Sequence, residues 1–252
     1  MNFAQLLSLD PSSFRRRPAI PAFDTINYGL LYNWYATQEQ SGGIFLVSDA
    51  MRGAGWAVPT DADFTTLATY LGGASVAGGK LKEMGFTSWN DPNTGATNEV
   101  GFNSRGSGVR TSNFSGKNAQ QYIWTQTGAI TPANYGWVAF LGASTTAFSV
   151  TGANPFYYGQ SIRPVRPATA AEQLLADGTA CDPYIGNDGK VYRTVKIGTQ
   201  VWLADNLAET KWSDGSWIAG FDGGVYTPIT NAAWEALTTA ALCAYENQIE
   251  NM

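Results

Sequence analysis

The chain has 252 residues, enough to bury one large hydrophobic core or two small ones. Its 28 glycines, 9 tryptophans, 12 tyrosines and 12 phenylalanines, with only 14% charged residues, indicate short strands, tight turns and long loops packed by aromatic side chains. A net charge of −5 argues against nucleic-acid binding, and the absence of histidine excludes Ser-His-Asp catalysis, Cys-His catalysis and the usual zinc sites.

Residues 1–27 contain three prolines and no sustained periodicity, which predicts an extended arm. Phe3–Leu9 is too short for a signal peptide and precedes the basic run, and no window approaches the roughly 20 apolar residues of a membrane span. We expect the arm to dock on another surface, of its own chain or of a neighbour. Its assembly residues would be Phe3, Leu6, Leu7, Phe14, Arg15, Arg16, Arg17, Ile20 and Phe23.

A core helix is predicted after an aromatic-rich strand over Tyr28–Ala36 and a loop to Gly55. Thr60 can cap the helix, and Asp61 and Asp63 fall in its positively polarised first turn. Its apolar face consists of Phe64, Leu67, Ala68 and Leu71, and Gly72-Gly73 ends it. A shorter helical turn is expected over Val76–Met84, followed by an ordered loop between Trp89 and Phe102.

From Gly106 to Arg166 the pattern predicts an antiparallel meander of short strands. The expected strands are Gly108–Thr111, Tyr122–Thr127, Tyr135–Leu141, Ala147–Thr151 and Ser161–Val165. Composition then shifts to Ala, Glu and Leu, so we interpret 28–167 as the main part of a domain and 168–186 as a linker.

Residues 187–252 form a second block. An Asn-Asp-Gly turn precedes an alternating strand, Val191–Ile197, in which Val191, Thr194 or Val195, and Ile197 would point inward. A second strand at Val201–Leu203, a helix capped by Thr230 or Asn231 that bears Trp234 and Leu237, and a strand at 241–245 follow. Cys181 and Cys243 would form either one disulfide or two buried thiols.

The chain resembles the Fibrobacter succinogenes major paralogous domain, found in surface proteins of Bacteroidota-type bacteria and their phages. The resemblance rests on DGKVYRTVKIGTQVWLADNL, ALCAYEN, YGLLYNWYA, GWAVPTDADFTTLATYLGG, AGGKLKE, WNDPNTGATNEVGF and SIRPVR. It implies an α+β, C-type-lectin-like domain with short antiparallel strands, one or two short core helices and long ordered loops. The family's cysteine staple is missing, because Arg52-Gly53-Ala54 and Pro164 stand in its places, and nothing matches the reactive cysteines of the related formylglycine-generating enzymes.

The order of the blocks differs from the family, in which the VYRTVKIG block opens the domain and SIRPVR closes it. Here 187–252 comes last. Either the chain is permuted and this block completes its own domain, or the block completes the domain of a neighbouring protomer. A truncated second copy without a partner is a third alternative, which would leave strand edges unpaired.

The loop after Trp89 is rich in oxygen ligands. Asn90, Asp91, Asn93 and Glu99 are candidate Ca²⁺ ligands, although a loop held by Asx turns is the favoured interpretation and no cofactor is expected. The pairs Asp61–Asp63 and Glu83–Glu99 could act as acid and base, but the first is explained by helix capping alone, so we do not expect an enzyme.

Aromatic residues are the second candidate site, because their faces can stack on sugar rings. Most aromatic residues of such a domain belong to its core, but the run after Asn154-Pro155 would lie at a loop tip. The candidate ligand-binding residues are Phe156, Tyr157, Tyr158, Trp124 and Trp137.

These features favour a structural or adhesive protein of a phage virion, such as a capsid decoration, head fibre or tail-tip component, which assembles in the host cytoplasm. We expect a homo-oligomer, with a trimer favoured, bound to other virion proteins through the arm and to host-surface glycans through the domain. The alternative is a bacterial cell-surface or secreted glycan-binding module; a polysaccharide-acting enzyme is less favoured.

Overall fold

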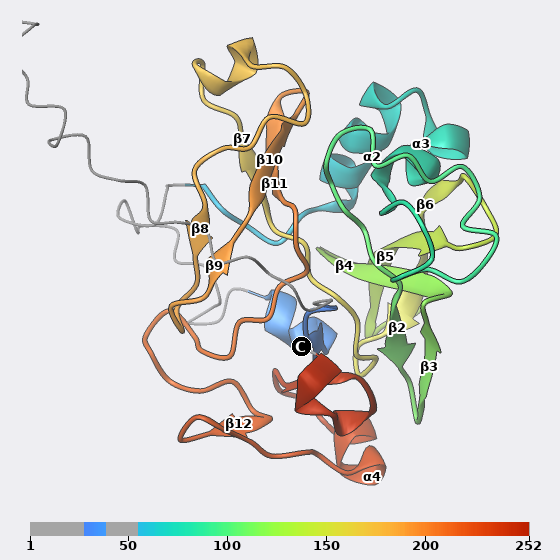
Figure 1. Ribbon diagram of the computed structural model, residues 1–252. Helices are drawn as coiled ribbons and strands as arrows, with labels where there is room; N and C mark the ends of the chain where they lie inside the picture. Colours follow the sequence, from blue (N-terminus) through green and yellow to red (C-terminus); the bar gives the residue numbers. More distant parts are fainter. Residues whose placement is uncertain (1–27, 39–54, 252) are drawn as a thin grey trace, which may run out of the picture.

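The computed structural model describes residues 28–38 and 55–251 (Figure 1), so the arm residues 1–27 lie outside the described part. The described chain has an α+β architecture of small sheets, short helices and long connecting loops. None of the helices in these ranges is long and apolar enough to cross a membrane.

The largest sheet has five strands in the order β3-β2-β4-β5-β6. The expected meander is present as β4, β5 and β6, which pair antiparallel, whereas β3 was not expected and β2 pairs parallel to β4 at Gly108 and Gln121. The strand bounds are β2 Ser107–Arg110, β3 Phe114–Lys117, β4 Gln120–Gly128, β5 Tyr135–Gly142 and β6 Phe148–Pro155.

The predicted core helix is α2, Asp61–Tyr70, and its start is fixed by a capping box. The Thr60 side chain accepts from the Asp63 amide at 3.1 Å, and the Asp63 carboxylate accepts from the Thr60 amide at 2.8 Å. Phe64, Leu67 and Ala68 are buried, as the spacing of the apolar residues predicts.

The second helix, α3, runs over Ala74–Leu81 and so begins and ends earlier than the expected Val76–Met84. Gly78 and Gly79 explain its position, because their missing side chains let the helix backbone touch two loops. A Cβ on Gly79 would lie 2.5 Å from the Gly95 carbonyl oxygen. The Gly79 amide donates to the Thr146 carbonyl at 3.1 Å, and its own carbonyl accepts from the Thr97 amide at 2.9 Å.

A three-stranded sheet, β10-β11-β7, joins the C-terminal block to the main part of the domain. β7 is Val165–Pro167, β10 is Thr194–Ile197 and β11 is Gln200–Leu203, with Val201 opposite Arg166. A second pairing joins β1, Leu31–Tyr32, to β14, Leu242–Cys243. In this structure the block 187–252 therefore pairs with strands of its own chain, and whether it exchanges between protomers stays a question for experiment.

The remaining elements are short. Two small antiparallel pairs are β8 with β9, which joins the linker to the C-terminal block, and β12 with β13 within that block; Thr230 rather than Asn231 caps α4. The bounds are η2 Trp34–Thr37, η3 Glu172–Leu174, β8 Tyr184–Ile185, β9 Val191–Tyr192, β12 Phe221–Asp222, β13 Val225–Tyr226, α4 Asn231–Glu235, η4 Tyr245–Asn247 and η5 Ile249–Asn251.

Three local expectations are wrong. The strand expected over Tyr28–Ala36 is reduced to β1, because the Asn33 side chain bonds to the backbone of Thr239 and Ala241 and turns the chain into η2. The strand expected over Ser161–Val165 starts only at Val165. The strand expected over Val191–Ile197 is divided into β9 and β10; Thr194, Val195 and Ile197 are buried as expected, whereas Val191 is only partly buried. Cys181 and Cys243 are free buried thiols, which excludes the disulfide.

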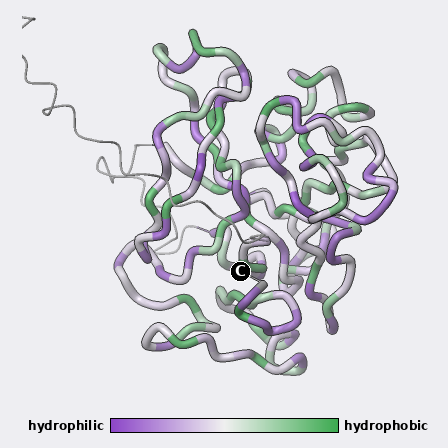
Figure 2. Tube along the Cα trace, viewed as in Figure 1, coloured by the Kyte–Doolittle hydropathy of each residue, from purple (hydrophilic) through white to green (hydrophobic). Residues whose placement is uncertain are grey.

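The described residues include two large clusters of buried apolar side chains, and the second of them contains Trp202. Trp202 of β11 stacks on Phe64 of α2, with ring centroids 5.1 Å apart, and meets Phe102 edge to face at 5.7 Å. Apolar and polar positions interleave along the chain (Figure 2), as expected where short elements each bury one side. Trp202 thus ties the C-terminal block into the core beneath α2.

Candidate functional site

The half-exposed aromatic residues around Phe156 form the clearest candidate for a binding surface. Phe156 stacks on Trp34 with ring centroids 3.8 Å apart and an interplanar angle of 4°. Tyr35 meets the Phe156 ring edge to face at 5.5 Å. Next in the chain, Tyr157 and Tyr158 form a T-shaped pair at 5.0 Å. We call Tyr35, Phe156, Tyr157 and Tyr158 the aromatic ledge; all four are partly exposed.

Backbone and side-chain hydrogen bonds hold the ledge in place. The Trp34 amide donates to the Phe156 carbonyl at 2.8 Å, and the Phe156 amide donates to the Asn134 carbonyl at 2.9 Å. The indole of Trp234 in α4 donates to the Tyr157 carbonyl at 2.5 Å. Burial, and then the neighbouring Tyr158, raise the pKa of Tyr157, so its hydroxyl stays protonated at neutral pH. The ledge is therefore a pre-organised apolar surface with hydroxyl groups at its margin.

The ledge agrees only in part with the aromatic residues selected from the sequence. Phe156, Tyr157 and Tyr158 lie together, as expected, and Trp137 is half-exposed on β5. Trp124 is wrong as a ligand contact, because it is fully buried and its indole donates to the Tyr32 carbonyl at 2.8 Å. Tyr35 was not selected; its place within an aromatic-rich stretch suggested a strand and gave no sign that the ring contacts Phe156.

The four oxygen-bearing residues of the loop after Trp89 have different surroundings. The side-chain Nδ2 of Asn93 donates to the backbone carbonyls of Glu83 and Gly85 at 2.9 and 2.8 Å. Glu99 pairs with Lys80 at 3.4 Å on the surface, and Asn90 and Asp91 are exposed. Within the described ranges no three carboxylate, cysteine or histidine side chains gather as metal ligands would.

A cation nevertheless lies beside this loop. The Lys82 ammonium, on a completely buried residue, donates to the carbonyl oxygens of Thr94, Gly142 and Thr145 at 3.0, 3.0 and 2.9 Å. Burial lowers the pKa of Lys82 to about 8, which leaves the side chain mostly protonated at pH 7.

The carboxylate pairs considered as acid and base have structural partners. Asp63 caps α2, Asp61 accepts from the Thr127 hydroxyl at 2.8 Å, and Glu83 pairs with Arg105 at 3.1 Å. A different pair lies around the Asn-Asp-Gly turn: Glu209 is completely buried, and the Asp188 side chain is 8% exposed.

Burial, and then the charge of Asp188, raise the pKa of Glu209 to about 7, although backbone amides donate to its carboxylate. Lys190 and Thr210 hold Asp188, whose pKa is lowered by hydrogen bonds to Lys190 even though burial acts in the opposite direction. Because backbone amides of the turn and of Thr210 and Lys211 enclose Glu209, the pair joins the turn to the segment that follows β11.

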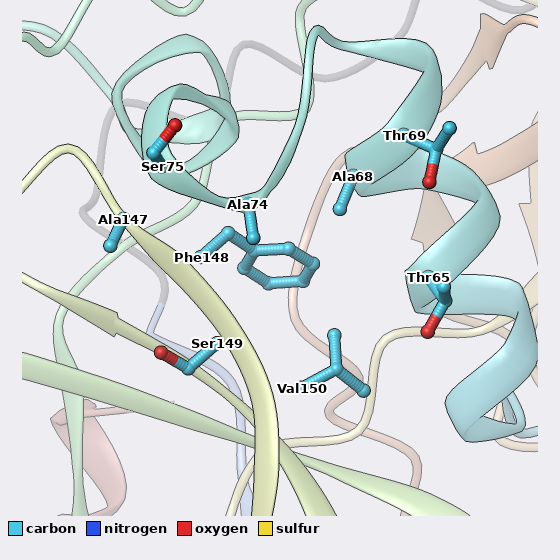
Figure 3. Close-up of a pocket in the computed structure, with 9 residues that line it drawn as sticks. All are labelled: Thr65, Ala68, Thr69, Ala74, Ser75, Ala147, Phe148, Ser149 and Val150. Atoms are coloured by element: carbon cyan, nitrogen blue, oxygen red, sulfur yellow. The ribbon is translucent and has the colours of Figure 1, made fainter.

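A groove of about 360 Å³ opens between α2, the start of α3 and β6 (Figure 3). The Phe148 ring lies between the two helices and the strand, with small and hydroxyl side chains around it. The lining residues are Thr65, Ala68, Thr69, Ala74, Ser75, Ala147, Phe148, Ser149 and Val150. None of them is titratable, so the groove offers apolar packing surfaces and hydroxyl groups.

Comparison with known proteins identifies one family. The model of the Fibrobacter succinogenes major domain matches residues 22–166, which is more than half of the chain. No curated protein and no solved structure matches. The matched range holds the aromatic ledge and both helices of the groove, and it ends within β7, just before the C-terminal block.

Proposed function

Since the chain belongs to the Fibrobacter succinogenes major domain family, we propose that it is a structural and adhesive protein of a phage virion. The chain would serve as a capsid decoration, head fibre or tail-tip component and present a C-type-lectin-like domain to glycans on the host surface. The single observation that supports recognition is the aromatic ledge, in which four partly exposed rings are held in fixed orientations.

A glycan is the ligand class that suits the ledge best. Sugar rings present apolar C–H faces that stack on aromatic rings, and their hydroxyl groups pair with groups such as the tyrosine hydroxyls at the margin. Rings held in advance lose little conformational entropy when a ligand binds. The net charge of −5 gives no general attraction to phosphate backbones.

Assembly would use the N-terminal arm. The C-terminal block pairs with β1 and β7 of its own chain, which supports assigning the joining of subunits to the arm. We propose a homo-oligomer, a trimer by preference, bound through the arm to other virion proteins.

A glycan array with the full-length protein tests the recognition. Phe156→Ala removes the centre of the ledge and is expected to weaken binding at least tenfold. Phe86→Ala is the matched control, because Phe86 is 63% exposed on a distant stretch of the chain, the loop after α3. Circular dichroism melts of both variants separate lost binding from lost folding. A wild-type protein that binds no glycan, or equal losses in the two variants, would contradict the proposal.

A bacterial cell-surface or secreted glycan-binding module is the second candidate. The family match begins at residue 22 and so leaves most of the arm outside the family domain. A module that binds glycans through this domain alone would not need the arm. Light scattering separates the candidates, since a virion subunit should lose its assembly when residues 1–27 are deleted, whereas a binding module should not change. A reducing-sugar assay with the bound glycans tests the less favoured polysaccharide-acting enzyme.

A further inference from the structure

Lys82 occupies an unusual position for a lysine. The residue follows α3 directly, and its amide donates to the Gly78 carbonyl at 3.1 Å. Its side chain then runs inward, passes the Trp89 ring with the ammonium 5.6 Å from the ring centroid, and ends among three carbonyl oxygens. An ammonium has three N–H donors, and here each has one acceptor at 2.9–3.0 Å.

No carboxylate of the described residues pairs with this ammonium, although the other ion pairs within the same ranges include the neighbouring Lys80–Glu99. A buried charge without a counter-ion is costly unless oriented dipoles replace its hydration. At Lys82 the carbonyl dipoles do so. Several backbone carbonyls around one positive charge are also the way in which proteins coordinate monovalent metal ions.

The three carbonyls come from two loops that α3 holds together. Thr94 belongs to the loop after Trp89, Gly142 is the last residue of β5, and Thr145 lies in the turn between β5 and β6. Gly79 of α3 bonds to both loops through Thr97 and Thr146. The ammonium therefore lies where α3, the loop after Trp89 and the β5–β6 turn meet. A bound ion at such a point would hold the three segments together.

We propose that these carbonyls form a structural cation site whose cation is the chain's own Lys82 ammonium. The ligand class is a singly charged primary ammonium. A divalent ion fits less well, because Ca²⁺ sites include carboxylates, and this site offers only neutral oxygens. The loop after Trp89 is thus ordered by a tethered cation and needs no metal.

Removal of the tether tests the proposal. The full-length Lys82→Ala variant keeps the three carbonyls but lacks the side-chain atoms Cγ, Cδ, Cε and Nζ. The cavity that these atoms leave has the size of n-propylammonium, which has three carbons and one ammonium nitrogen. We expect the melting temperature to fall by about 10 °C. Hydrogen exchange should also accelerate at the Thr94, Thr97 and Ala147 amides. n-Propylammonium chloride should restore at least half of the lost melting temperature, whereas tetramethylammonium chloride at the same ionic strength, which cannot donate hydrogen bonds, should not.

Three controls sharpen the result. Lys80→Ala removes the neighbouring exposed lysine and should show neither the loss nor the rescue. Lys82→Met fills the space without a charge, so it should be destabilised and insensitive to n-propylammonium. The melting temperature of the wild-type protein should not change with EDTA or with added Ca²⁺. If Lys82→Ala fails to fold on expression, its refolding yield with each of the two ammonium salts gives the same comparison.

Several outcomes would overturn the inference. A Lys82→Met variant as stable as the wild type would mean that the charge is dispensable. Equal effects of the two ammonium salts on Lys82→Ala would mean that the carbonyls do not select a hydrogen-bonding cation. A wild-type protein destabilised by EDTA would mean that a metal ion orders the loop instead.

Discussion

Buried charged side chains connect segments that are distant in this sequence. Arg163 is completely buried, and its guanidinium donates to the carbonyls of Phe102 and Leu203 at 2.7 and 3.0 Å and to the Asn206 side chain at 2.7 Å. Burial lowers its pKa to about 9. It therefore binds the C-terminal block to the main part of the domain mainly through backbone oxygens, as Lys82 binds its two loops.

Substitution of Arg163 should be costly. Arg163→Met keeps an apolar stem but leaves two buried carbonyls and the Asn206 amide oxygen with fewer partners, and we expect a loss of about 3–5 kcal/mol in the free energy of unfolding. Urea unfolding monitored by tryptophan fluorescence measures it. Lys80→Met, at an exposed ion pair, should cost less than about 1 kcal/mol. If both variants lost the same free energy of unfolding, the buried contacts of Arg163 would stabilise the fold no more than the exposed ion pair does.

Glu209 makes stability depend on pH. Its pKa is raised from 4.5 in the unfolded chain to about 7 in the folded one, so the folded state binds the proton more tightly. The resulting stabilisation is fully present below about pH 4.5 and is lost as the pH rises through 7. The lowered pKa of Asp188 acts only below 3.8, outside this window.

We therefore expect the free energy of unfolding to decrease between pH 5 and pH 7.5, and Glu209→Gln to remove most of that decrease. Urea unfolding at half-unit steps of pH gives the slope for each protein. Glu83→Gln, at a carboxylate paired with Arg105, is the matched control and should keep the wild-type slope. A Glu209→Gln variant with an unchanged slope would assign the pH dependence to another group.

Among the helices and strands, the sequence predicts those whose bounds depend on residues close together in the chain. The start of α2 follows from Thr60 and Asp63, and the β4–β6 meander follows from alternating residues between turns. The bounds of the other elements depend on contacts between segments that are distant in sequence. Asn33 ends β1 through bonds to residues more than 200 positions away, which no local pattern contains.

α3 shows how a tertiary contact overrides propensity. In an exposed helix, alanine is more favourable than glycine by about 1 kcal/mol. At Gly79, however, a Cβ would meet the Gly95 carbonyl at 2.5 Å and separate the helix from the loop. Gly79→Ala should thus lower the free energy of unfolding by about 1–3 kcal/mol, as measured by urea unfolding.

Ser75→Ala is the control for α3, because Ser75 is exposed in the first turn of the same helix. It should be neutral or slightly stabilising. If Gly79→Ala were stabilising, as propensity alone predicts, the close approach of helix and loop would not be needed for the fold.

At the scale of the whole molecule, the candidate site could be predicted only where consecutive residues share it. Phe156, Tyr157 and Tyr158 are neighbours in sequence and remain neighbours on the ledge. Tyr35 is distant from them in sequence but its ring contacts Phe156. Trp124 is not part of the ledge, because the side of β4 that it occupies packs on Tyr32. Which face of a strand is covered depends on the packing of the sheets, and hydropathy alone does not reveal it.

Because the C-terminal block pairs with its own chain, we expect the domain to stay assembled after the linker is cut. The linker between the two parts exposes Leu174 (88%), so a protease site inserted there should be cleaved without disturbing the core. The fragments should remain together in native buffer, held by β7–β11, β1–β14 and the bonds of Arg163, and should separate in denaturant. Size-exclusion chromatography of the cleaved protein measures this, and fragments that separate without denaturant would contradict the paired arrangement.

Light scattering of the uncut protein then distinguishes completion within the chain from exchange between chains. If the arm alone joins subunits, deletion of residues 1–27 should reduce the oligomer to the mass of one chain, while the domain stays folded because β1 and β7 keep their own partners. If the block were exchanged between protomers, the oligomer would persist without the arm, since each domain would still need a neighbour's β11 and β14. Persistence of the oligomer after the deletion would therefore favour exchange and contradict assembly through the arm.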